Sequence, residues 1–181
     1  MKKLILLVTL FSYISICTFA QHDHGSHQKQ PTNSNKEAAT KTAVKDGGSQ
    51  LQLSQLLSVY YNIKNALVTG DASSAASNAD EFVKTINTID FKVISEGNAH
   101  ILAKDAGKIS TTKDLKKQRE YFASFSSNMA LVAKALKLGN QAIYLQYCPM
   151  KKATWLSSEK QIRNPYYGSS MLTCGEVTET L

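Results

Sequence analysis

The fold is decided by the stretch LSQLLSVYYNIKNAL at residues 53–67, whose large apolar side chains recur with the period of an α-helix. Successive members of the pattern lie three, four, three and four positions apart, which places them on one stripe of a helix. They are Leu53, Leu56, Tyr60, Ile63 and Leu67. Such a stripe has to be buried against another element, so the stretch predicts an amphipathic helix in a helical core.

A second helix is predicted after a short connection. Gly70 is suited to ending the first helix, and Asp71 is a natural N-cap for the next one. The apolar residues of the second helix repeat the same spacing: Ala75, Ala79, Phe82, Ile86 and Ile89. Because the connection is short, we expect the two helices to be antiparallel neighbours.

Two more helices are predicted beyond residue 90. The first is short and less regular, and we expect it to end at Gly107. Its apolar residues are Ile94, Ile101 and Leu102. The second is the longest, and we expect it to begin at Thr111 or Thr112 and to end at Gly139. Its apolar face consists of Leu115, Phe122, Phe125, Met129, Val132 and Leu136.

The last forty residues abandon the helical spacing. Residues 142–148, AIYLQYC, are aromatic and β-inclined and predict a strand, beside which residues 154–156 could return. The sequence NPYYG at residues 164–168 predicts a turn, and residues 176–181 could close a small sheet. The expected fold is therefore mainly α: an antiparallel up-and-down bundle of three to four helices with a small C-terminal β element.

The first twenty residues have the features of a secretory signal peptide. Lys2 and Lys3 are followed by an apolar stretch that is short for a transmembrane helix of about 20 residues and that ends in small side chains. We therefore expect residues 1–20 to be removed and the mature protein to be exported, to the periplasm or beyond, with no transmembrane segment left. Lipoprotein anchoring through Cys17 is not expected, because Ile16 fits poorly before a lipidated cysteine.

Residues 21–48 have almost no large apolar side chains and end in two glycines, so we expect a disordered linker there. Histidines gather at its start, at His22, His24 and His27. Imidazole is a borderline donor suited to Cu(II), Ni(II) or Zn(II), so these three residues are a candidate secondary metal site. Residues 49–181 are then expected to form the single folded domain.

The composition excludes several classes of function. A chain of 181 residues is too short for a two-domain enzyme with a large cofactor-binding half. The net charge is +7, but the lysines are scattered, and an exported protein is not expected to meet nucleic acid. The sequence also lacks a nucleophile elbow, a glycine-rich phosphate loop and a CxxC pair, so no enzymatic activity is expected.

Two Cys–Met pairs in the C-terminal part carry the strongest chemical signal. Loss of the signal peptide leaves Cys148 and Cys174, with Met150 and Met171 close to them in the sequence. Thiolates and thioethers are soft donors that select Cu(I) or Ag(I) over harder cations. The alternative is a structural Cys148–Cys174 disulfide with both methionines filling the core, and such a bridge would stabilise the fold by roughly 3–4 kcal/mol.

Three aromatic residues accompany the Cys–Met pairs: Trp155, Tyr166 and Tyr167. We expect them chiefly to pack the small sheet on the bundle. They are also candidates to shield a Cu(I) site from water and oxidants, or to present a ring face to the cation. The remaining histidine, His100, stands alone on a predicted helix and is expected to be a surface or packing residue.

Motifs in the first helix and in the C-terminal part are shared with a known family. They are Tyr60-Tyr61, Lys64, Ala66-Leu67-Val68, Cys148-Pro149-Met150, Trp155-Leu156, Ile162, Asn164-Pro165-Tyr166-Tyr167-Gly168, Met171-Leu172 and Cys174-Gly175. With these motifs the chain resembles, over about residues 50–181, a bacterial domain-of-unknown-function family, number 3347. Members look like exported single-domain proteins or attachments to periplasmic copper/silver efflux adaptor proteins. The resemblance implies a link to heavy-metal handling and supplies no ligand set.

Two functions are therefore expected. The first is a periplasmic protein that binds Cu(I) or Ag(I) through Cys148, Met150, Met171 and Cys174 and takes part in heavy-metal handling or efflux. Its partners would be the metal ion and a periplasmic efflux adaptor or metallochaperone. The alternative is a non-enzymatic interaction module in which a Cys148–Cys174 disulfide is structural and which docks to an envelope or efflux assembly.

Overall fold

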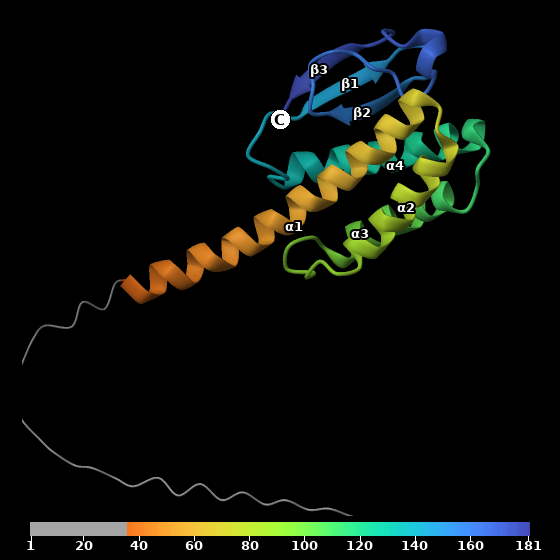
Figure 1. Cartoon of the computed structure of the whole chain (residues 1–181). Coiled ribbons are helices and arrows are strands. Elements are labelled where there is room, and N and C mark those ends of the chain that lie inside the picture. The colour runs from red at the N-terminus through yellow and green to blue at the C-terminus, as the bar shows by residue number, and fades with distance from the viewer. Residues whose placement is uncertain (1–35) are drawn as a thin grey trace, which may run out of the picture. The chain divides into compact units, whose positions relative to one another are not determined.

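The computed structural model of the protein describes residues 36–181, and it contains four α-helices followed by a three-stranded sheet (Figure 1). The helices are α1 Lys36–Thr69, α2 Ala72–Ile86, α3 Glu96–Ser110 and α4 Leu115–Ala135. The strands are β1 Tyr144–Cys148, β2 Ala153–Ser157 and β3 Glu176–Thr180, with a short 3-10 helix, η1 Gly168–Met171, before β3. The expected signal peptide and the histidines at 22–27 lie outside the described residues.

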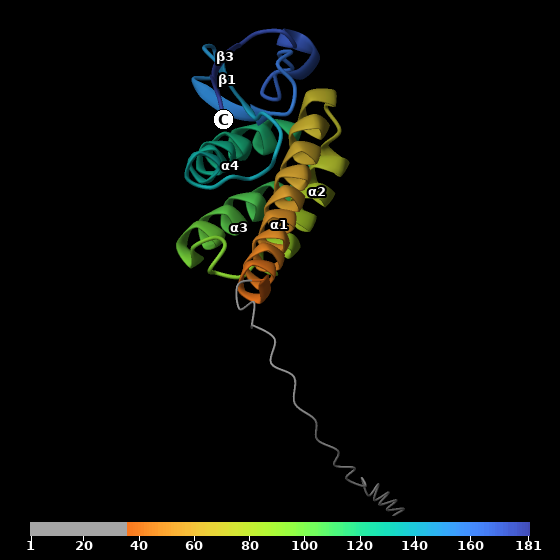
Figure 2. The same ribbon diagram turned by 90° about the vertical axis from the view of Figure 1, so that its left-hand side faces the viewer.

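Successive helices pack against one another, α1 on α2, α2 on α3 and α3 on α4. They run up and down along the bundle (Figure 1). The sheet packs through β2 on α4, so that α4 lies between α3 and the sheet (Figure 2). The predicted fold class, a helical bundle with a small C-terminal sheet, is confirmed.

The predicted apolar stripes form the core. Every member of the stripes in the first two helices is buried: Leu53, Leu56, Tyr60, Ile63, Leu67, Ala75, Ala79, Phe82, Ile86 and Ile89. In α4 the middle of the stripe is buried, whereas Leu115 and Leu136 at its two ends are only partly covered. Of the three apolar residues predicted on the short helix, Leu102 is buried and Ile101 is 45% exposed on α3. Ile94 is buried but lies just before α3 begins, so its expected place on the helix is wrong.

Helix α1 begins at Lys36, well before Ser49, where we expected the folded domain to begin. Residues 36–48 therefore form the first turns of α1, although we expected them in the linker. This stretch is rich in alanine and lysine, which have high helix propensity. Extending an existing helix avoids the cost of nucleation, and the two glycines at 47 and 48 cost only about 1 kcal/mol each.

Three other helix ends also differ from the prediction. Helix α3 continues through Gly107 to Ser110, because a glycine inside a helix is tolerated at a cost of about 1 kcal/mol. Helix α4 is capped by Asp114 rather than by a threonine, since the Asp114 carboxylate accepts the N–H groups of residues 116 and 117 at 3.0 and 3.2 Å. It ends at Ala135, ahead of Gly139, because Leu136 adopts an extended conformation.

The sheet has the strand order β2-β1-β3, and both pairs are antiparallel. The predicted strands and the return of residues 154–156 beside β1 are thereby confirmed, with Leu145 opposite Leu156. A register shift at Leu145/Gln146 marks the pairing of β1 with β3. The central position of β1 leaves β2 as an edge strand against the helices.

Two tyrosine hydroxyls satisfy the free edge of β2. The N–H of Leu156 donates to the Tyr60 hydroxyl of α1 at 3.0 Å, and the Tyr166 hydroxyl donates to the carbonyl of Thr154 at 2.5 Å. The Tyr60 hydroxyl also shares a hydrogen bond of 2.5 Å with Ser126 of α4. The free N–H and C=O groups of an edge strand can pair with another chain. Because these bonds satisfy two such groups of β2, they hold β2 on the bundle.

We predict that Tyr60→Phe destabilises the protein by about 1–3 kcal/mol, because it leaves the buried N–H of Leu156 and the Ser126 hydroxyl with one partner fewer. Chemical denaturation followed by circular dichroism measures the loss. Tyr121→Phe, at an exposed site on α4, is the matched control and is expected to change stability by less than about 0.5 kcal/mol. Equal stabilities for the two variants would contradict this role of Tyr60.

Candidate metal centre

The first cysteine lies at the end of β1, where the chain enters a tight turn. The N–H of Lys152 donates to the carbonyl of Cys148 at 2.8 Å, and Lys152 has the left-handed φ of 55° that closes the turn. Within this turn the N–H of Lys151 donates to Cys148 Sγ at 3.4 Å. The side chain of Cys148 is fully buried. The turn after β1 therefore wraps the backbone around this sulfur.

The second cysteine lies on the turn between η1 and β3. The N–H of Cys174 donates to the carbonyl of Met171 at 3.1 Å, which closes that turn. The N–H of Asn164 donates to the carbonyl of Leu172 at 2.8 Å, which ties the turn to the NPYYG segment. Cys174 is partly buried and packs against the hydrophobic core.

Asn164 brings the two cysteine turns together. Its side-chain amide donates to Cys148 Sγ at 3.1 Å and to the carbonyl of Cys174 at 2.8 Å. Its side-chain oxygen accepts the N–H groups of Tyr166 at 2.8 Å and Tyr167 at 3.3 Å. Asn164 is fully buried, and all of its donors and acceptors are used. We predicted only a turn at this residue. An asparagine at the start of a turn commonly hydrogen-bonds the backbone N–H two residues further on. The NPYYG sequence could therefore have indicated the bond from the Tyr166 N–H to the Asn164 side chain.

The two thiols are neighbours. Both cysteines are free, and the side-chain amide of Asn164 bonds the sulfur of Cys148 and the carbonyl of Cys174. Burial raises the pKa of the Cys174 thiol, and the neighbouring Cys148 raises this pKa further through its charge and through hydrogen bonding. Two neighbouring thiols offer a pair of soft donors to one cation. In the structure the two cysteines are unbridged, and metal binding by their thiols stays a prediction.

Both methionines lie on the surface. Met150, two residues after Cys148, is 62% exposed, and Met171, three residues before Cys174, is 39% exposed. Neither is part of the core, so the interpretation of these methionines as core filler is wrong. Each thioether lies on the same turn as one of the two thiols. The turns therefore carry one buried and one partly buried thiol together with two exposed thioethers.

The aromatic residues pack the sheet on the bundle, as expected. Trp155 is fully buried and meets Tyr166 edge to face at a centroid distance of 6.0 Å. Tyr166 in turn contacts Phe122 of α4 at 5.8 Å, whereas Tyr167 is only partly buried. Burial, and after it the charges of Tyr60 and Cys148, raises the pKa of Tyr166 well above its usual range. Shielding of a bound cation by these rings stays a prediction.

One side chain holds the start of the segment that carries Asn164, and its end packs against a second side chain. The side-chain amide of Gln146, on β1, donates to the carbonyls of residues 159, 160 and 161, at 2.8–3.3 Å. At the other end of the segment is Arg119 of α4, whose guanidinium donates to the carbonyl of Leu67 in α1 at 2.9 Å. Gly168 lies against this guanidinium with φ of 53°, and a Cβ there would come within 2.5 Å of Arg119 Nη2. Only glycine fits at this point of the turn.

Gly175 sets how closely the second cysteine turn approaches Trp155. Its φ is 148°, and a Cβ would lie 2.8 Å from Trp155 Cη2 and 2.8 Å from the carbonyl oxygen of Tyr147. The indole edge therefore lies directly against the residue that follows Cys174. The indole N–H of Trp155 is buried and has no hydrogen-bond partner among residues 36–181.

Lys64, a residue of the shared motif in α1, is only 3% exposed. Burial lowers the pKa of its ammonium group to about 8, an effect that Glu159 opposes and Arg163 reinforces. The sequence placed Lys64 in a motif but gave no reason to expect its burial. A buried ammonium of this kind destabilises the fold at neutral pH.

The other candidate features lie apart from the cysteines. His100 is exposed on α3, and within residues 36–181 no group of three or more His, Cys, Asp and Glu side chains gathers around a point. The helices of the same residues include none long and apolar enough to cross a membrane.

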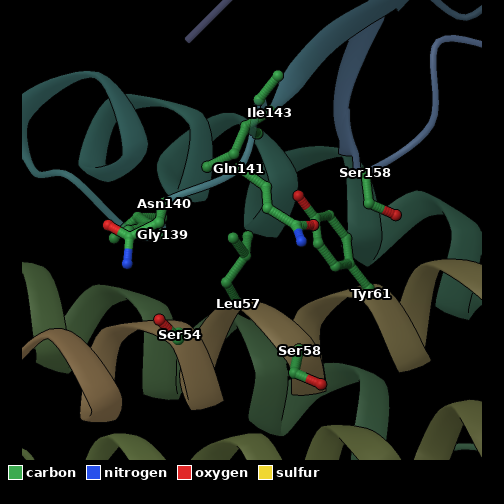
Figure 3. Close-up of a pocket in the computed structure, with 11 residues that line it drawn as sticks. Ser54, Leu57, Ser58, Tyr61, Gly139, Asn140, Gln141, Ile143 and Ser158 are labelled. Carbon is green, nitrogen blue, oxygen red and sulfur yellow. The ribbon is translucent and has the colours of Figure 1, made fainter.

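A cavity of about 420 Å³ lies between α1 and the segment 138–143, and neither a cysteine nor a methionine lines it (Figure 3).

The helical part of the chain matches a known family. Residues 56–141 match the model of a family described as a protein of unknown function, DUF3347. The match confirms the family resemblance over these residues, including the Tyr60–Val68 motifs, and it ends before β1 and the cysteine turns. No curated protein and no solved structure matches the chain.

We predict that Gly175→Ala displaces Trp155. The added methyl would overlap the indole edge and would force an unfavourable φ, so a loss of about 1–3 kcal/mol is expected. The protein has one tryptophan, so its fluorescence spectrum reports the displacement directly. Gly97→Ala is the control, since nothing lies within 4 Å of a Cβ at that helical site, and it should be neutral or stabilising. An unchanged emission spectrum in Gly175→Ala would show that the contact is not tight.

We predict that Lys64→Met stabilises the protein at pH 7 by up to about 3 kcal/mol, since one pKa unit corresponds to about 1.4 kcal/mol. Between the folded pKa of about 8 and the ordinary value of 10.5, the unfolded chain binds more protons at this site than the folded one. The contribution of Lys64 to stability therefore rises with pH across that window, and the advantage of Lys64→Met shrinks between pH 7 and pH 10. Lys104→Met, at an exposed site on α3, is the control. A pH-independent difference between parent and Lys64→Met would be the contrary result.

Proposed function

We propose that this chain, which belongs to the DUF3347 family through residues 56–141, binds Cu(I) or Ag(I) at the pair of thiols formed by Cys148 and Cys174. The observation that carries the proposal is that Asn164 joins two free cysteines on turns that each also carry an exposed methionine. Sulfur donors of this kind select soft monovalent cations, and methionine is not among the usual ligands of zinc.

The chemistry of binding is an exchange of protons for metal. One Cu(I) ion would take up two thiolates, and the two thiol protons would leave to solvent. The hydrogen bonds that Asn164 and Lys151 donate to Cys148 Sγ favour negative charge on that sulfur. The thioethers of Met150 and Met171 are neutral and exposed, so they are suited to meet the ion first and to complete its coordination.

The proposed role is non-enzymatic handling of a soft metal outside the cytoplasm. With the expected signal peptide, the protein would work in the periplasm and pass its ion to, or receive it from, an efflux adaptor or a metallochaperone. His22, His24 and His27 would add a secondary site for Cu(II), Ni(II) or Zn(II) ahead of the folded domain. Trp155, Tyr166 and Tyr167 would keep water and oxidants from the inner side of the thiol pair.

We predict that the double variant Met150→Leu/Met171→Leu keeps the stability of the parent within about 1.5 kcal/mol and binds Cu(I) at least about tenfold more weakly. The substitution nearly conserves volume and removes only the thioethers. Both proteins are titrated with Cu(I), fully reduced and without oxygen, against a competing chelator.

The control for the double variant is Met129→Leu, since Met129 is the fully buried methionine of α4. Its affinity for Cu(I) should equal that of the parent. Equal affinities for the parent and the double variant would remove the methionines from the site and leave a binding site of two thiolates. Absence of Cu(I) uptake by the reduced parent would refute the proposed function itself.

A further inference from the structure

The two cysteines differ in how their sulfur atoms are held. Cys148 Sγ receives an amide N–H of Asn164 at 3.1 Å and the backbone N–H of Lys151 at 3.4 Å, and its side chain is fully buried. Among the hydrogen bonds of residues 36–181, none runs from an N–H group to Cys174 Sγ. The main chain of Cys174 is bound by Met171 and by Asn164.

Asn164 cannot release Cys148 without breaking several other bonds. Its amide also holds the carbonyl of Cys174, and its oxygen holds two backbone N–H groups of the NPYYG turn. Because the residue is fully buried, each bond that broke would leave a polar group without water as a substitute. The position of the Cys148 sulfur is therefore fixed by the whole turn.

We propose that Asn164, acting with the Lys151 N–H, positions Cys148 as the permanent ligand of the soft-metal site, and that Cys174 is the ligand that exchanges when the metal enters or leaves. The inference rests on the proposed function. N–H groups that donate to a ligating sulfur orient it and stabilise its negative charge, whether or not a metal is bound. Cys174 lacks such donors and is only partly buried, so its sulfur is the one that an incoming ligand can replace.

The exchange is a substitution at the metal with no change of oxidation state. The thiolate of an incoming molecule forms a bond to Cu(I), the bond between Cu(I) and Cys174 Sγ breaks, and Cys174 leaves as a thiolate that takes a proton from solvent. The ion then bridges Cys148 and the partner. The partner class is a molecule with an accessible thiolate or thioether, and it would approach past Met150 and Met171, the exposed sulfurs of the two turns.

The first test compares Cys148→Ser with Cys174→Ser. Each full-length variant is titrated with Cu(I) in the absence of oxygen against a competing chelator, and glutathione is the probe for exchange. We expect Cys148→Ser to bind at least about tenfold more weakly than Cys174→Ser, which should keep one ion per chain. Glutathione should form a ternary complex with Cu(I) and Cys174→Ser, and none with Cys148→Ser. Equal losses in the two variants, or a larger loss in Cys174→Ser, would overturn the inference.

The second test addresses Asn164. Asn164→Asp keeps an oxygen for the N–H groups of Tyr166 and Tyr167 and replaces the donor at Cys148 Sγ by a second oxygen. We expect a loss of Cu(I) affinity of about 10–100-fold and a shifted thiolate-to-copper charge-transfer band. Asn62→Asp, on the exposed side of α1, carries the same change of charge and should leave both unchanged. An Asn164→Asp protein that is folded by circular dichroism and binds like the parent would refute the positioning role.

The outcomes separate this inference from the proposed function. If the reduced parent takes up no Cu(I), both fail together. If the parent binds one ion while the two cysteine variants lose affinity equally, the function stands and the assignment of separate roles to Cys148 and Cys174 fails. The cysteine comparison does not use Asn164→Asp, so it decides the question even if that variant does not fold.

Discussion

The Tyr60 hydroxyl joins the two parts of the domain. It accepts the edge N–H of Leu156 in β2 and bonds to Ser126 of α4, while its ring stacks between α1 and α4 at 5.7 Å from Phe122. Burial raises the pKa of Tyr60 well above its usual range, so the phenol keeps its proton. Within residues 36–181, the helical core has no strand that could pair with the edge of β2. The Tyr60 side chain takes the place of such a strand by accepting the N–H of Leu156. The position of the sheet, and of the turns that it carries, depends on this bond together with the bond from the Tyr166 hydroxyl to Thr154 and the packing of β2 on α4.

The strand pairing in the sheet determines where the two cysteine turns lie. Strand β1 lies at its centre and ends at Cys148, and β3 begins two residues after Cys174, so the antiparallel pairing of β1 with β3 brings the two turns to the same end. Asn164 then joins them by hydrogen bonds to a sulfur and a carbonyl. Gly175 lets the second turn lie against Trp155. The result is two neighbouring thiols on turns that also carry exposed thioethers, and thiolates and thioethers are the donor types that soft cations prefer.

Most of the fold could be predicted from the sequence, because its apolar residues recur at helical spacing and its last residues do not. The bounds of the helices could not, since caps such as Asp114 compete with neighbouring threonines, and since α1 extends over a polar stretch that has no apolar stripe. The four sulfur donors were visible as residue types near each other in the sequence. The proximity of the two thiols, the exposure of the methionines and the donors at Cys148 arise from tertiary structure, which spacing alone does not encode.

The central claim is that the sulfur atoms of the two cysteine turns hold one soft ion. It is tested most directly by copper K-edge X-ray absorption on the reduced, full-length protein loaded with one equivalent of Cu(I) under anaerobic conditions. The account predicts stoichiometric copper in the Cu(I) state with a first shell of sulfur alone. A first shell of nitrogen or oxygen, or failure to retain one equivalent of copper, would contradict it.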